Sequence, residues 1–166
     1  GRLTFNPLNH IDLFGSILLP LFLIMSNSPF LVGWAKPVPV NPYNLRDQKY
    51  GPLKVAFAGP GINLAVALFF GLLLRFAFPF MSSGFLTIIS YIVYVNLLLA
   101  IFNLIPVPPL DGSHILFSIL PKSFDGLRIF METFGFIILV FVILFCSSWI
   151  SFVLGWLFQF ITGFQG

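Results

Sequence analysis

The chain has 166 residues, of which 58% are hydrophobic and only 8% are charged, against about 25% charged residues in an average globular protein. This balance excludes a soluble globular domain and a disordered chain, and the single cysteine excludes a disulfide scaffold. The net charge of +3 arises without clusters of basic and aromatic residues, so nucleic-acid binding is not indicated. The composition predicts an integral membrane protein surrounded by lipid.

The first 54 residues are the most polar part of the chain. Residues 1–12 contain neither an initiating Met nor a signal-like apolar core, so we expect the chain to be an internal piece of a longer protein. The apolar run Leu13–Met25 is short, which favours a re-entrant segment, although a span that continues to Ala35 stays open. Gly1–Pro7 and the proline-rich Lys36–Pro42 are predicted to be extended, and pairing between them would satisfy their backbone groups.

Three longer apolar regions follow. Val55–Leu74 and Gly84–Ile105 contain no charge, and each is long enough for a transmembrane helix of about 20 residues. No charge follows Glu132 either, and the region 133–160 is predicted to form one span, or two if Ser147-Ser148 divides it. We therefore predict an all-α integral membrane protein. It would be a polytopic helix bundle of three to four spans, in one domain over residues 1–166, with a short re-entrant or extended β segment near the cytoplasmic side. The parts of this domain are a polar strand, re-entrant and loop region at 1–54 and transmembrane segments at 55–74, 84–105 and 133–160.

The basic residues indicate which side of the membrane each loop faces. If Leu13–Met25 re-enters, seven basic residues share one side and Arg75 alone lies opposite; if it spans, the division is six against two. Either pattern follows the positive-inside rule and places the Lys36–Lys54 loop and the Asp111–Glu132 region in the cytoplasm. The seven residues of the first pattern are Arg2, Lys36, Arg46, Lys49, Lys54, Lys122 and Arg128.

Asp111 is the most informative residue, because it follows a long apolar run that is broken by three prolines. A carboxylate at or near a membrane interior is costly and suggests a functional site, while the simpler alternative is an N-cap for the Ile115–Leu120 helix. Asn103 lies eight residues earlier in apolar surroundings. Its amide could orient a substrate or stabilise an oxyanion, or it could form a helix-to-helix hydrogen bond.

A second motif, Gly59-Pro60-x-x-Asn63, combines small residues with a proline and an amide inside a predicted span. Close packing against the Pro106–Asp111 break is the simplest interpretation, with Asn63 satisfying a carbonyl that the proline frees. The histidines, His10 and His114, do not complete a metal site by themselves, because catalytic zinc takes three protein ligands and the sequence contains no H-E-x-x-H.

Taken together, these motifs resemble the site-2 protease family of intramembrane zinc metalloproteases. The resemblance rests on Asn103-x-x-Pro106-x-Pro108-x-Leu110-Asp111-Gly112 and on the Gly59-Pro60-x-x-Asn63 motif before it. The opening residues 1–12 and the segment Gly33–Pro42 look like the compact bacterial members that lack a PDZ domain. The four motifs occur in the family's order and cover residues 1 to about 115.

The resemblance implies a zinc ion held by Asp111 and by two histidines of an H-E-x-x-H helix, whose glutamate is the general base. Asn103 would orient the substrate or the oxyanion, and the residues supporting the site would be Gly59, Pro60, Asn63, Pro106, Pro108 and Gly112. The H-E-x-x-H helix would lie upstream of Gly1, so this chain alone is expected to be inactive and without tight zinc binding.

The resemblance also implies a substrate and a place for it. The substrate would be a transmembrane protein, and the setting a bacterial plasma membrane. A substrate helix would unwind and add as a strand to the edge near Arg2–Asn6 or Lys36–Val40. Two other functions stay open: a transporter or channel with Asp111 on an ion path, and a non-catalytic membrane scaffold.

Overall fold

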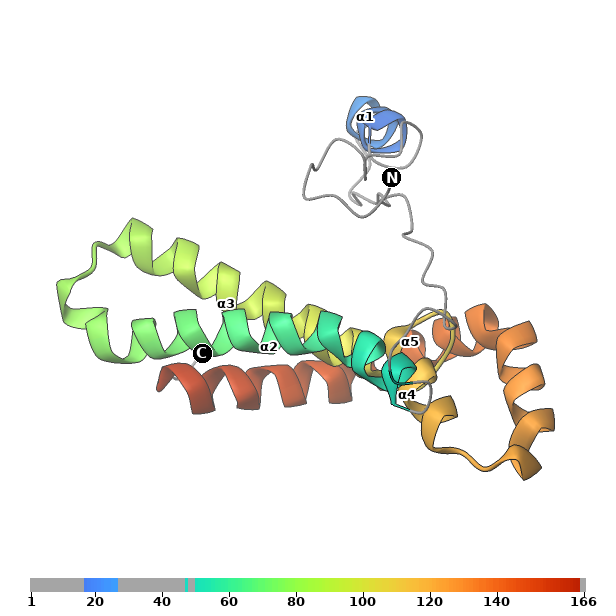
Figure 1. The fold of residues 1–166 in the computed structure, drawn as a ribbon. Coiled ribbons are helices and arrows are strands. Elements are labelled where there is room, and N and C mark those ends of the chain that lie inside the picture. The colour runs from blue at the N-terminus through green and yellow to red at the C-terminus, as the bar shows by residue number, and fades with distance from the viewer. Residues whose placement is uncertain (1–16, 27–46, 48–49, 165–166) are drawn as a thin grey trace. The chain divides into compact units, whose positions relative to one another are not determined.

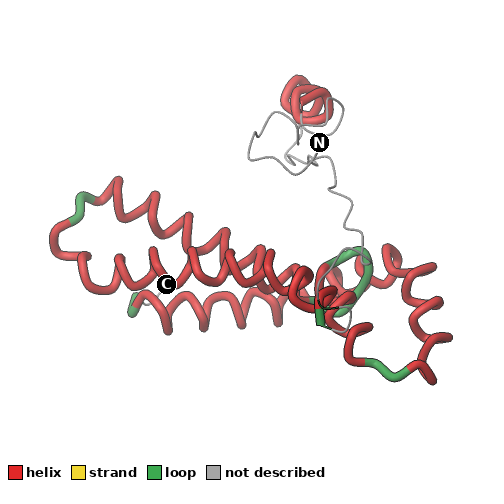
Figure 2. The backbone as a smooth tube through the Cα atoms, in the orientation of Figure 1, coloured by secondary structure: helices red, strands yellow, loops and turns green. Residues whose placement is uncertain are grey.

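The computed structural model describes residues 17–26, 47 and 50–164, and these residues form helices and loops without any strand (Figure 2). The chain divides into two units, Gly1–Asn44 and Leu45–Gly166. The extended segments predicted at Gly1–Pro7 and Lys36–Pro42 lie outside the described residues. The all-helical prediction therefore agrees with the structure, whereas the predicted β segment receives no support from it.

The first unit contains the helix α1, Leu19–Met25. Seven residues at 1.5 Å each give a length of about 11 Å, well short of the roughly 30 Å of a bilayer core. The described side chains of α1 are exposed, and the helix ends where the Ser26 hydroxyl donates a hydrogen bond of 2.7 Å to the Phe22 carbonyl. Because residues 13–16 lie outside the described part, re-entry of this segment stays a prediction.

The second unit begins with α2, Gly51–Ala77, which continues into the short 3-10 helix η4, Phe78–Phe80. Pro60 is buried inside α2, yet the helix runs through it without a break. A proline lacks the N–H that would bond to the carbonyl four residues earlier, and membrane helices tolerate this loss where neighbouring groups pack closely. The Gly59-Pro60 motif is thus part of one long helix.

Two cations mark the ends of α2. Lys54 Nζ lies 2.8 Å from Asp47 Oδ2, and Arg75 Nη1 donates a hydrogen bond of 2.9 Å to the Phe160 carbonyl. The rise of 1.5 Å per residue separates the Cα atoms of Lys54 and Arg75 by about 32 Å. That distance matches the roughly 30 Å hydrocarbon thickness, so the helix between these two cations fits a bilayer with both charges at the interfaces.

The helix α3, Ser83–Leu104, returns antiparallel beside α2 (Figure 1). The last helix, α5, Asp125–Thr162, brings its C-terminal part along the same pair. These three helices enclose the core, which consists of Ala67, Leu74, Ile89, Val93, Leu97, Leu154 and Ile161. Gly71 permits the close approach of α5, because a Cβ added there would lie 2.4 Å from Ile161 Cγ2. A small residue at the crossing point is the usual way in which membrane helices pack closely.

The described residues include three helices that are long and apolar enough to cross a membrane: Gly51–Phe80, Ser83–Leu104 and Asp125–Thr162. The predicted segments 55–74 and 133–160 fall within the first and third, and 84–105 overlaps the second almost completely. The helix α5 continues through Ser147-Ser148, so the possible division at that point is not observed. Most of its side chains between Val140 and Val153 are exposed, as expected for a lipid-facing surface.

Candidate functional site

A proline-rich loop connects α3 to the short helix α4, Asp111–Ile119. Its prolines prevent α3 from continuing, and the loop is closed by its own backbone hydrogen bonds. Leu110 N donates to the Val107 carbonyl at 3.0 Å, and the Leu110 carbonyl accepts bonds from Ser113 N at 3.0 Å and Ser113 Oγ at 2.7 Å. Val107 and Ser113 are both buried. The loop therefore holds Asp111 in a defined position at the start of α4.

Asp111 is the first residue of α4, and Leu110 occupies the N-cap position without a side-chain cap hydrogen bond. The N-cap alternative for Asp111 is therefore wrong. Its side chain is half-buried and, among the residues that the structure describes, forms no hydrogen bond or ion pair. The first turn of a helix favours a negative charge, which stabilises the carboxylate without occupying its oxygens. The oxygens remain available to bind a cation.

Gly59 of α2 lies directly against this carboxylate. A Cβ added at Gly59 would be 3.1 Å from Asp111 Oδ2, so the glycine leaves the space in which the carboxylate sits. Gly59 follows Lys54 by five residues, which places it about 8 Å inward from the Lys54 end of α2. With the membrane interface placed at Lys54, Asp111 would lie at the depth of the hydrocarbon region, toward the side with the basic residues, where an ionisable group suggests function.

Gly112 fixes the start of α4 against the end of α3. A Cβ added at Gly112 would lie 2.4 Å from the carbonyl oxygens of both Leu104 and Ile105. Backbone atoms cannot move aside as a flexible side chain can. Only glycine therefore fits at this position.

We expect Gly112→Ala to destabilise the protein by about 1–3 kcal/mol, the usual cost of overpacking a close contact. Gly155→Ala is the matched control, because Gly155 is helical and a Cβ there meets nothing within 4 Å. Unfolding in mixed detergent micelles measures both variants. Equal stabilities for the two would contradict the packing described for Gly112.

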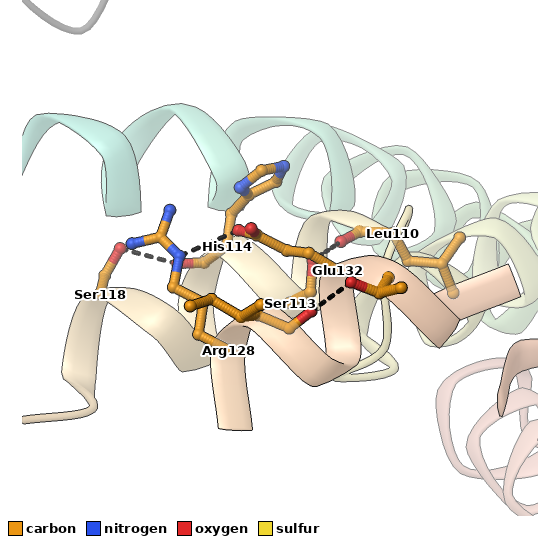
Figure 3. A network of polar contacts seen from close by, with 8 residues as sticks. Leu110, Ser113, His114, Ser118, Arg128 and Glu132 are labelled. Carbon is orange, nitrogen blue, oxygen red and sulfur yellow. Dashed lines mark hydrogen bonds and ion pairs between the residues drawn. The ribbon is translucent and has the colours of Figure 1, made fainter. Parts of the chain in front are cut away.

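The polar face of α4 lies next to the start of α5 (Figure 3). Ser118 Oγ donates a hydrogen bond of 2.7 Å to the His114 carbonyl, and Arg128 of α5 lies 5.4 Å from the Phe117 ring centroid while it pairs with Glu132 at 2.9 Å. The His114 imidazole is exposed and points away from the Ser113–Leu110 contact. No group of three His, Cys, Asp or Glu side chains that could hold a metal occurs in the described part of the chain.

The three asparagines of α2 and α3 differ in how their side chains are hydrogen-bonded. Asn96 Nδ2 donates to the Ile92 carbonyl of its own helix at 2.8 Å, and therefore needs no other partner. Asn63 and Asn103 are half-buried, and neither forms a hydrogen bond within the described structure. The suggested bond from Asn63 to a carbonyl freed by Pro60 is thus not formed. Asn63 lies one turn beyond Gly59, and Asn103 lies in the last turn of α3, so both belong to the helices that border Asp111.

Three contacts between distant segments carry no motif in the sequence. Gly71 of α2 lies against Ile161 of α5, and Gly135 of α5 lies against Pro108. Arg75, near the end of α2, donates a hydrogen bond to the Phe160 carbonyl near the end of α5. Isolated glycines in apolar runs are a weak hint of close helix packing. Such a glycine does not indicate which residue it contacts, because that residue lies far away in the sequence.

The comparisons with known proteins identify the family of the chain. The chain is 37% identical over 161 residues to a Bacillus subtilis protein named "Putative zinc metalloprotease YwhC", an alignment that covers 93% of the chain and 69% of that protein. The chain belongs to the site-2 protease family. The family model described as peptidase family M50 matches residues 78–146, a range that includes Asn103, Asp111 and Gly135.

A second relative of this protease-family chain is archaeal. The chain is 38% identical over 63 residues to a Methanocaldococcus jannaschii protein named "Putative zinc metalloprotease MJ0611", covering 38% of the chain and 32% of that protein. No solved structure matches the chain. The family assignment, with three apolar helices of membrane-spanning length, makes this a membrane protein of a metalloprotease family.

The site fits one zinc ligand of such a protease. Asp111 offers carboxylate oxygens that no described residue uses, beside a glycine that leaves room for them. Zinc accepts carboxylate oxygen together with imidazole nitrogen, and a catalytic site uses three protein ligands. The described residues contain no group of three such ligands, and the sequence contains no H-E-x-x-H to add two histidines.

Proposed function

We propose that this chain forms part of an intramembrane zinc metalloprotease that cleaves peptide bonds of transmembrane protein substrates. The observation that carries the proposal is the Asp111 carboxylate, which has no described partner and lies beside Gly59 of the membrane-length helix α2. Family membership favours a protease over an ion transporter or a non-catalytic scaffold. Two histidines and a glutamate of an H-E-x-x-H helix, absent from these 166 residues, would complete the site.

Zinc bound in such a site would polarise the substrate carbonyl and activate a water molecule. Asp111 would hold the metal from the α4 side, with its position fixed by the proline loop and by Gly59. Asn103 would donate its amide N–H to the substrate carbonyl, where negative charge develops during attack. The membrane surroundings limit the supply of water and strengthen these electrostatic interactions.

We further propose that the protein resides in a bacterial plasma membrane, with the Lys54 end of α2 and the start of α5 on the cytoplasmic side. The basic residues gathered at that end support this orientation, since Arg75 is the only basic residue at the other end of α2. A substrate would enter the site from the lipid. Fractionation that recovers the protein outside the plasma membrane would contradict this part of the proposal.

Removal of the metal tests the reaction itself. The full-length protein, reconstituted in liposomes with a single-span substrate, is expected to lose cleavage when treated with a zinc chelator and to regain it when zinc is added. A matched soluble peptide of the same sequence measures whether the membrane location of the substrate matters. Cleavage that persists after chelation would show that the reaction does not depend on zinc.

A further inference from the structure

The loop that carries Asp111 is held from one side by α5, through a contact that the sequence motifs do not indicate. Gly135 of α5 is buried, and a Cβ added there would lie 2.6 Å from the carbonyl oxygen of Pro108, 2.7 Å from its Cβ and 3.1 Å from its carbonyl carbon. Two of these three atoms belong to the backbone. A side chain at position 135 would therefore displace the loop itself.

The other glycines of α5 have space for a side chain. A Cβ added at Gly126 or at Gly155 meets nothing within 4 Å. Glycine also lowers the stability of a helix interior by up to about 1 kcal/mol relative to alanine. Gly135 alone therefore has a steric reason to lack a side chain, and that reason is the Pro108 backbone.

A displacement at Pro108 would be transmitted to Asp111. The loop on either side of Pro108 is anchored, because Val107 is only 6% exposed and its carbonyl accepts the Leu110 N–H at 3.0 Å. On the other side of Asp111, Gly112 lies against the backbone carbonyls of Leu104 and Ile105 at the end of α3. These carbonyls prevent Gly112 from moving toward α3. Movement of the loop would thus change the position of Asp111 relative to Gly59.

We propose that Gly135 is a positioning residue for the zinc site, acting through Pro108 on the Asp111 carboxylate. The proposal rests on the proposed function, in which Asp111 binds zinc. Gly135 touches neither metal nor substrate. Its role is to let α5 lie close enough to hold the proline loop in place. The helix α5 would thus support the site without contributing a zinc ligand.

The experiment measures zinc affinity by competition with chelators in the full-length protein that contains this chain. Gly135→Ala is expected to weaken zinc binding by roughly 10–100-fold, the effect typical of residues that orient a metal ligand. Gly155→Ala in the same helix is the control and is expected to leave the affinity unchanged. Equal affinities for the two variants would overturn the proposal.

A double-mutant cycle with Asp111→Asn separates positioning from general destabilisation. If Gly135 acts through Asp111, Gly135→Ala should change zinc affinity by less than about twofold when Asp111 is already replaced, because the coupled residues are not additive. The same fold-change in both backgrounds would overturn the proposal. If Asp111→Asn alone leaves zinc affinity unchanged, the proposed function itself fails, and this outcome is distinct from the other two.

Pro108→Ala examines the contact from the other side and adds no atoms to the packed region, so it serves if Gly135→Ala does not fold. The substitution keeps the Cβ and the carbonyl group that face Gly135, but it opens the ring that fixes φ at position 108 and so loosens the loop. We expect weaker zinc binding, and we expect this effect to be absent in the Asp111→Asn background. Unchanged affinity in Pro108→Ala would contradict the dependence of Asp111 on a rigid loop, through which Gly135 is proposed to act.

Discussion

Asp111→Ala is expected to abolish peptide-bond cleavage in the full-length protein and to weaken zinc binding by more than about 100-fold. The substitution removes the only described carboxylate at the site, and no neighbouring His, Cys, Asp or Glu cluster among the described residues can replace it. Loss of a ligand should exceed the roughly 10–100-fold effect of losing an outer-shell partner. Metal analysis of the purified protein and cleavage of a reconstituted transmembrane substrate measure the two effects separately.

Asp125→Ala is the control for the loss of one negative charge. Asp125 also lies in the first turn of a helix, α5, but its side chain is exposed at the start of the apolar segment. Its replacement should cost only the few tenths of a kcal/mol of a surface helix-terminus charge and leave zinc bound. Normal zinc content in Asp111→Ala would show that Asp111 is not a ligand.

Asn103→Leu is expected to lower kcat by about 10²–10³-fold, the loss measured when one oxyanion donor is removed. Zinc content should not change, because the substitution leaves Asp111 in place. The structure motivates this prediction, since the Asn103 amide is half-buried and has no hydrogen-bond partner among the described residues. Single-turnover kinetics on the reconstituted substrate would separate the chemical step from substrate binding.

Asn96→Leu, in the same helix, is the matched control. The Asn96 amide already donates to the Ile92 carbonyl one turn earlier, so its removal should leave kcat near that of the unmodified protein. A parallel fall of kcat in both variants would indicate a general effect of removing amides from α3. An unchanged kcat in Asn103→Leu would exclude the amide from the reaction.

The sequence singled out the region of Asp111, but it could not decide between a helix cap and a functional carboxylate. Both interpretations, the cap and the functional carboxylate, place an aspartate after a proline break. They differ only in which atoms the carboxylate contacts. The structure assigns the N-cap position to Leu110 and leaves Asp111 without a described partner. The same limit applied to Asn63, whose expected hydrogen bond within α2 is absent from the described structure.

The last apolar region shows a similar limit. Its composition allows one long helix or two short ones, because serines occur in both the interior and the breaks of membrane helices. The structure contains one helix of 38 residues, α5, packed near its start by Gly135 and near its end by Leu154 and Ile161. These contacts are made to the proline loop and to the helices α2 and α3, so no local pattern could reveal them.

The sequence by itself determined the membrane environment, the approximate positions of the three long helices and the family. These depend on the transfer of apolar residues into lipid and on short motifs, which are properties of consecutive residues. Only the tertiary structure decided that Gly59 makes room for Asp111, that Gly112 is held by the end of α3 and that Gly135 supports Pro108. These contacts join segments that lie apart along the chain. Their distances follow from how helices pack, which composition and periodicity do not specify.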